Sequence, residues 1–208
     1  WMLAQWRAEG IGTEFVVRAK DRLPGFYAIR TDGEGERQFF YWRDRAPARD
    51  LLDFPESKVI FERLASYDWI YLTGVTLSLY GPGAQEKLFA LLDRVRSNGG
   101  KVAFDSNYRP RGWKDAANAS VIFKQMIART DLAMPTLDDD MQVFGDQDAA
   151  VCADRLHGSG VREVVVKLDA DGCLVSTPGL REMVPTIPRA QPVDTTGAGD
   201  AFNAGYLA

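Results

Sequence analysis

Short apolar runs of strand-forming residues alternate with helical patterns from about residue 57 to the end of the chain. Glu163–Lys167 contains three consecutive valines, a composition typical of a parallel strand that is buried on both faces. Two further strand-like runs, residues 69–72 and Lys101–Asp105, are separated by a helical pattern over residues 84–96. Strands that are joined through helices form parallel sheets, so the alternation predicts an α/β fold with a doubly wound, mostly parallel sheet.

An aromatic hairpin precedes this alternation. The strand-like runs at residues 26–30 and 37–43 are separated by turn-forming residues at 31–36. Aromatic side chains on both runs suggest a small sheet that covers something rather than a buried central strand. We therefore expect one domain over residues 1–208, with a small β-lid at about residues 23–45.

Size and composition exclude several classes of protein. A chain of 208 residues can bury a core without disulfides, and its net charge of −4 argues against a nucleic-acid or basic membrane surface. Its longest apolar runs are far shorter than the roughly 20 residues that a membrane span needs. Two cysteines and one histidine argue against disulfide scaffolds and zinc sites, and fit a cytoplasmic protein with no dedicated metal ligands.

The two ends of the sequence look cut from a longer chain. It begins at Trp1 with neither an initiator methionine nor a signal peptide, and it ends at Ala208 inside a helical pattern.

The segment Asp194-Thr195-Thr196-Gly197-Ala198-Gly199-Asp200 carries the strongest chemical signal in the sequence. Glycines at a helix start let several backbone N–H groups approach one anion, and the helix dipole adds to the attraction. A carboxylate at Asp200 repels bound phosphate, so its placement favours another task, removing a proton from an attacking hydroxyl. A glycine-rich turn capped by an aspartate is the structural alternative. A dinucleotide fingerprint does not fit, because its third glycine would fall at Phe202.

This segment resembles the C-terminal signature D-T-x-G-A-G-D of the ribokinase-like, PfkB-type carbohydrate kinases. The resemblance spans essentially the whole chain, and the aromatic hairpin is similar to the family's β-lid. It implies a sugar kinase that uses ATP and Mg²⁺, with Asp200 as the catalytic base and the backbone of Gly197, Ala198 and Gly199 as the anion hole. It also implies that family segments precede Trp1 and follow Ala208.

Within the family, residues 25–30, 41–43 and 105–110 are most similar to 2-keto-3-deoxygluconate kinases. The resemblance implies that the substrate is a sugar acid, phosphorylated on its 6-hydroxyl and bound by Tyr27, Tyr41, Trp42, Arg43, Arg109 and Asp200. The forked guanidinium of arginine matches a carboxylate, whereas a neutral sugar needs hydroxyl partners. Packing of the two tyrosines within the lid, and a solvated Arg43, are the structural alternatives.

The residues that match the family's nucleotide-binding residues follow several of the predicted strands. The resemblance implies that ATP is bound by Asn107, Arg109, Thr136, Lys167, Gly172, Gly197, Ala198 and Gly199. Two departures from the family pattern stand out: Asp169 replaces a glycine in the turn after Lys167, and Thr136 with Asp139 replaces an N-x-x-E element.

Two other functions remain open from the sequence. A kinase of the same family could act on fructose, ribose or a nucleoside, and the polypeptide could be a catalytically silent binding or assembly fragment. We expect a sugar acid and ATP as small-molecule partners, no nucleic acid or membrane, and a homo-oligomer.

Overall fold

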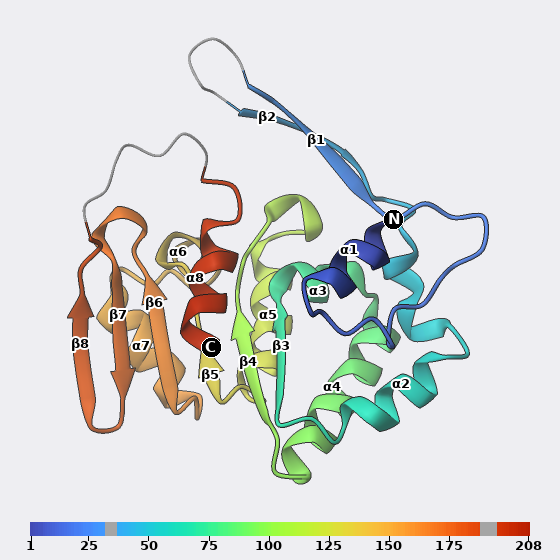
Figure 1. Cartoon of the computed structure of the whole chain (residues 1–208). Helices are drawn as coiled ribbons and strands as arrows, with labels where there is room; N and C mark the ends of the chain where they lie inside the picture. Colours follow the sequence, from blue (N-terminus) through green and yellow to red (C-terminus); the bar gives the residue numbers. More distant parts are fainter. Residues whose placement is uncertain (32–36, 188–194) are drawn as a thin grey trace.

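The computed structural model describes residues 1–31, 37–187 and 195–208. Six strands form the main sheet in the order β3-β4-β5-β6-β7-β8, and β1 and β2 form a separate hairpin that extends away from it (Figure 1). The strands of the main sheet are β3 (Trp69–Thr73), β4 (Lys101–Asp105), β5 (Leu132–Ala133), β6 (Glu163–Lys167), β7 (Cys173–Thr177) and β8 (Leu180–Val184). Strands β3 to β6 are parallel, and β7 and β8 complete the sheet as antiparallel strands.

The helices connect the parallel strands as the alternation predicts. They are α1 (Met2–Ala8), α2 (Ser57–Leu64), α3 (Gly74–Leu79), α4 (Pro82–Ser97), α5 (Ala116–Ile127), α6 (Leu137–Phe144), α7 (Ala149–Gly158) and α8 (Ala198–Leu207), with short 3₁₀ turns at Pro47–Asp53, Pro110–Gly112 and Asp169–Asp171. Two aspartates fix helix starts: Asp115 accepts a hydrogen bond from the backbone N–H of Asn118, and Asp148 accepts one from Val151. Each bond satisfies an N–H group that has no partner within its helix.

The parallel strands follow one another in chain order, so their right-handed crossovers place α4, α5 and α7 on one face (Figure 1). The main hydrophobic core lies there, around Phe123, Leu92 and Val166. Helix α8 lies against the other face, where Phe202 and Tyr206 pack on a smaller cluster. Helices on both faces of a mostly parallel sheet confirm the predicted α/β class.

Some local predictions need correction. Helix α3 was not predicted: it begins at Gly74, directly after β3, where an added Cβ would lie 2.0 Å from the carbonyl oxygen of Ser106. Helix α2 and strand β8 were not predicted, whereas α8 begins at Ala198, within the glycine-rich segment that was expected to open a helix. Residues 32–36, which fall in the predicted hairpin turn, and Asp194, the first residue of the glycine-rich segment, lie outside the described residues.

Across the described part of the chain, the structure contains no helix that combines the length and the apolar character needed to span a bilayer.

Candidate active site

The carboxyl ends of β4 and β6 and the start of α8 meet around an open cleft of about 590 Å³. We call it the acidic cleft, because five carboxylates line it against two basic side chains. The carboxylates are those of Asp105, Asp138, Asp139, Asp169 and Asp200, and the basic residues are Arg109 and Lys167. Every residue that the resemblance assigns to ATP lines this cleft: Asn107, Arg109, Thr136, Lys167, Gly172, Gly197, Ala198 and Gly199.

The N-terminus of α8 forms one wall of the acidic cleft. Gly197 is its N-cap in the left-handed region (φ 75°), a conformation that glycine adopts without strain. The N–H of Ala198 already donates to the carbonyl oxygen of Thr195 at 3.1 Å, so the amides best placed for an anion are those beside it, at Gly197 and Gly199. Asp200 follows in the first turn and is exposed to the cleft. A carboxylate and open helix amides therefore face the same space.

The floor of the acidic cleft contains a buried polar network. The Lys167 ammonium donates to Asp105 Oδ2 at 2.6 Å and to Asn203 Oδ1 at 3.1 Å. Asp105, Lys167 and Asn203 are 2%, 6% and 1% exposed. The sequence places Lys167 at a strand end, but the partners of its ammonium come from residues 62 and 36 positions away along the chain.

Asp139 and Arg109 form a second polar contact in this cleft. Asp139 Oδ2 accepts a hydrogen bond from the backbone N–H of Tyr108 at 3.0 Å and lies 3.6 Å from Arg109 Nη1. Burial raises the pKa of Asp139 to about 6, against the lowering influence of Arg109 and the Tyr108 amide. Asn107 beside them has a positive φ of 31°, and its buried side-chain oxygen has no hydrogen-bond partner among the described residues. An unpaired buried acceptor at the edge of a cleft is a natural contact for a ligand.

The turn after β6 accommodates the residue that departs from the family pattern. Asp169 adopts the left-handed region (φ 49°), which glycine favours, so the backbone keeps the shape that a glycine would give it. Gly172 has φ 99°, and an added Cβ there would lie 2.0 Å from the carbonyl oxygen of Val184. The turn therefore requires glycine at 172 and tolerates aspartate at 169.

A second cleft, of about 460 Å³, lies between the base of the β1–β2 hairpin and the body of the molecule. We call it the basic cleft, because Arg43, Arg49, Arg109 and Arg111 line it together with a single carboxylate, Asp44. The Nε atom of Arg49 is buried and has no hydrogen-bond partner in the part of the chain that the structure describes. Arg109 lines both clefts, so the two hollows meet at this side chain.

The hairpin brings three of its four predicted substrate residues to the basic cleft. Strand β1 (Phe26–Thr31) pairs with β2 (Arg37–Trp42), and Tyr41, Trp42 and Arg43 line the cleft, with the Arg43 guanidinium 4.3 Å from the centre of the Tyr41 ring. Tyr27 pairs with Tyr41 in the strand register, and their ring centres are 6.1 Å apart, but Tyr27 does not line either cleft. Sequence reasoning missed Arg49 and Arg111, which lie in 3₁₀ turns and carry no recognisable motif.

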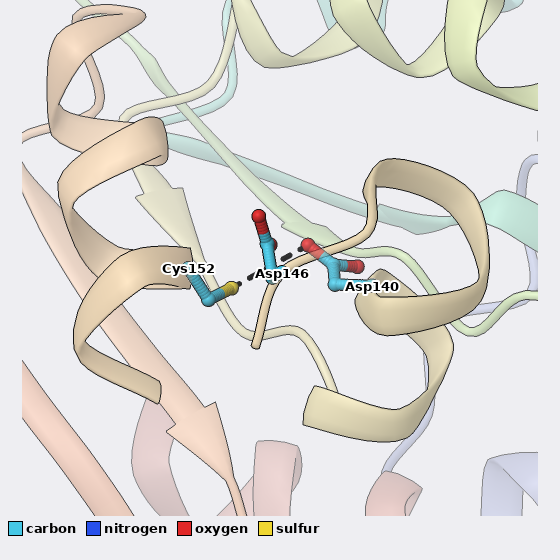
Figure 2. A group of neighbouring side chains, drawn as sticks. All are labelled: Asp140, Asp146 and Cys152. Atoms are coloured by element: carbon cyan, nitrogen blue, oxygen red, sulfur yellow. Dashed lines mark hydrogen bonds between the residues drawn. The ribbon is translucent and has the colours of Figure 1, made fainter. Parts of the chain in front are cut away.

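Asp140, Asp146 and Cys152 form a separate group of ligand-type side chains, on α6, α7 and the turn between them (Figure 2). Their ligand atoms lie within 4.8 Å of one another. The guanidinium of Arg155 donates to Asp140 Oδ2 at 2.5 Å and to Asp146 Oδ2 at 2.7 Å, and the Cys152 thiol donates to Asp140 Oδ2 at 3.6 Å. Because a fixed positive charge already bridges both carboxylates, we interpret the group as an ion-pair network that joins α6 to α7.

Comparison with known proteins identifies one family. The sequence matches the pfkB family carbohydrate kinases over residues 1–208. It is 46% identical over 210 residues to a 2-dehydro-3-deoxygluconokinase of Escherichia coli K12, an alignment that covers 100% of this chain and 68% of that protein.

Solved structures agree on the fold. A PfkB protein of Polaromonas sp. JS666 superimposes with a TM-score of 0.84 at 24% identity, over 99% of this chain and 66% of that one. An E. coli protein described as ribokinase II, in complex with ATP and Mg²⁺, gives a TM-score of 0.79 at 19% identity, over 99% and 63% of the two chains. The chain thus spans about two thirds of the length of the proteins that it matches.

Proposed function

The chain belongs to the pfkB family of carbohydrate kinases, and from that premise we propose that it transfers the terminal phosphoryl group of ATP to a sugar acid. The acceptor is 2-keto-3-deoxygluconate (2-dehydro-3-deoxygluconate), and the product is its 6-phosphate. The observation that carries the proposal is the meeting of a basic and an acidic cleft at Arg109, with Asp200 and the amides of α8 on the acidic side. The 46% identity to a 2-dehydro-3-deoxygluconokinase supports the same acceptor.

The basic cleft supports an acid rather than a neutral sugar as the acceptor. Four arginines line it in a chain whose net charge is −4, and one carboxylate opposes them. A guanidinium gives a carboxylate two parallel hydrogen bonds, each strengthened by charge. Such bonds contribute roughly 1.5–3 kcal/mol each, enough to select an acid by about ten- to hundredfold.

The acidic cleft supports a nucleotide that arrives with a metal ion. Nucleotide phosphates alone would be repelled by its carboxylates. Oxygen donors of this kind suit Mg²⁺, which takes most of its ligands from phosphates and water, so the side chains that would join them are the carboxylates of this cleft. Mg²⁺ bound there would offset the negative charge of the phosphates.

The chemistry assigned to this chain is deprotonation and charge stabilisation. Asp200 accepts the proton of the acceptor's 6-hydroxyl as that oxygen attacks the γ-phosphorus, and the bond to the leaving ADP breaks in line. The amides of Gly197 and Gly199 donate hydrogen bonds to the phosphoryl oxygens, where charge is present throughout the transfer. Tyr41, Trp42 and Arg43 enclose the acceptor from the hairpin side, and Tyr27 supports Tyr41.

A panel of acceptors tests the proposal. The purified chain is assayed with ATP and Mg²⁺ against 2-keto-3-deoxygluconate, gluconate, fructose, ribose and a nucleoside, with ADP release as the signal. We expect kcat/KM to be at least tenfold higher for 2-keto-3-deoxygluconate than for any neutral acceptor. A neutral sugar as the best substrate would move the enzyme to another branch of the family, and no turnover with any acceptor would favour a silent fragment.

A further inference from the structure

Helix α8 is docked on the sheet through a buried amide. Asn203 is the buried residue of this helix, with 1% of its surface exposed. Its apolar neighbours Phe202 and Tyr206 are only partly buried, and the Tyr206 hydroxyl donates to Glu163 at 2.6 Å. The position of α8 therefore depends on polar contacts more than is usual for a helix that packs on a sheet.

The Asn203 side chain uses its donors and its acceptor within the network. Its Nδ2 atom donates to Asp105 Oδ2 at 2.7 Å and to the Tyr71 hydroxyl at 3.0 Å, while its Oδ1 atom accepts from Lys167 Nζ at 3.1 Å. These bonds join α8 to three strands, β3, β4 and β6, which are far apart in the sequence. Because three hydrogen bonds hold this side-chain amide, they fix both the distance of α8 from the sheet and its rotation about the helix axis.

The ion pair beneath Asn203 keeps the network rigid. Lys167 and Asp105 are 2.6 Å apart, with side chains 8% and 3% exposed. The other carboxylate oxygen of Asp105 accepts from the backbone N–H of Asn107 at 3.0 Å. A buried pair of this kind contributes little net stability compared with apolar packing, and its best attested use is to specify one arrangement.

The network lies directly under the groups that the reaction needs. Asn203 follows Asp200 by three residues, so the two residues lie on the same side of α8. A Cβ built on Gly199 would be 3.8 Å from Lys167 Nζ, which places the ammonium against the first turn of the helix.

From this arrangement we propose that Asn203, held by Lys167 and Asp105, is a positioning residue that sets where Asp200 and the α8 amides stand relative to the acceptor and the phosphates. The inference rests on the function proposed above. The position of these groups matters, because a displacement of a reacting group by about 1 Å can lower the rate on the order of 100-fold.

The first test compares two buried substitutions. Asn203→Leu keeps the volume and removes the polar contacts, and Thr130→Val removes one buried hydrogen bond at a site that lines neither cleft, from the Thr130 hydroxyl to Met126. We expect Asn203→Leu to lower kcat by about 10–100-fold, with KM for both substrates changed less than threefold. Thr130→Val should change kcat less than twofold. A kcat for Asn203→Leu within twofold of the unaltered chain, corrected for the folded fraction, would overturn the proposal.

The second test separates positioning from direct contact with ATP. Lys167→Met combined with Asp105→Asn removes both charges together and avoids leaving one of them buried alone. Because part of the network's effect passes through Asp200, this double change should lower kcat by a larger factor in the unaltered chain than in a chain that already carries Asp200→Asn. A raised KM for ATP that persists in the Asp200→Asn background would assign Lys167 to the nucleotide instead and contradict positioning.

A third experiment tests whether Asn203 holds α8 on the sheet, and it requires no enzymatic activity. Amide hydrogen exchange of α8 should be at least tenfold faster in Asn203→Leu than in Thr130→Val, because loss of the network lets this helix open locally. Equal exchange in the two variants would refute the docking role even if activity is absent. Failure of the unaltered chain to phosphorylate any acceptor would contradict the proposed function and leave this result to stand separately.

Discussion

The two clefts differ in the sign of their charge and in how that charge is balanced. In the acidic cleft the two basic groups are both engaged: Lys167 is bonded to Asp105, and Arg109 lies near Asp139. In the basic cleft four arginines face one carboxylate, and within the described structure the buried Nε atom of Arg49 has no hydrogen-bond partner. A cleft whose basic groups are already paired with its own carboxylates keeps an excess of negative charge. That charge suits a nucleotide bound together with a metal ion. A cleft with an excess of positive charge suits an anion that carries no metal ion.

The largest expected effect comes from the acidic side. Asp200→Asn removes the proton acceptor and keeps the shape, so kcat should fall by about 10²–10⁴-fold, while calorimetry still detects binding of the acceptor. The matched control is Asp154→Asn, which changes an exposed carboxylate outside both clefts. Near-normal turnover of Asp200→Asn would remove the general base from the mechanism.

The next effect tests the residue that the two clefts share. Arg109→Ala should reduce kcat/KM for 2-keto-3-deoxygluconate by about 10–100-fold, the value of one or more charge-assisted hydrogen bonds. Its effect on a neutral ketose should be much smaller. Equal losses with both acceptors would mean that Arg109 serves the phosphates rather than the acceptor's carboxylate.

A smaller effect is expected at the rim of the basic cleft. Arg111 is exposed and lies in the 3₁₀ turn after β4, so Arg111→Ala should raise KM for the sugar acid by no more than about fivefold, as solvated ion pairs typically do. The KM for ATP should stay unchanged, because Arg111 does not line the acidic cleft. A change confined to ATP would reverse the assignment of the two clefts.

The smallest effect is a pH dependence of stability that comes from Asp139. Burial raises the pKa of Asp139 from 3.8 to about 6, so the folded state holds this proton more tightly than the unfolded chain does. The stability that the proton contributes is complete below about pH 3.8 and is lost as pH rises through about 6. Asp139→Asn cannot ionise, so urea unfolding at pH 4.5 and pH 7.5 should show a smaller loss in the variant than in the unaltered chain. Parallel losses would place the titration elsewhere.

The sequence is most informative about the candidate site where one short segment carries the proposed chemistry. Residues 195–200 lie at the start of α8 and the other polar residues follow strand ends, so motif and periodicity suffice to group in one cleft the residues that the resemblance assigns to ATP. Prediction from the sequence fails where the role of a residue depends on partners that are distant in the sequence. Asn203 acquires its role from Asp105 and Tyr71, which lie 98 and 132 residues away, and no local pattern marks those pairs.

Two arginines of the basic cleft, Arg49 and Arg111, were missed for a different reason. Arg49 and Arg111 lie in 3₁₀ turns, which have no long periodicity, and each resembles an ordinary solvated charge in the sequence. Only the fold of the hairpin base over the body brings them to the same hollow as Arg43. The net charge of −4 conceals this local excess of positive charge.

The two cysteines of the chain are buried, so a cysteine introduced on the surface can be labelled selectively. Cys152 and Cys173 are 0% and 5% exposed, and burial raises the pKa of both, so neither supplies much thiolate to a maleimide at neutral pH. A single cysteine introduced at Ile29, 36% exposed on the hairpin, would therefore accept a fluorophore almost alone. Labelled in this way, the protein would report by energy transfer or quenching whether the hairpin swings toward the body when each ligand is added.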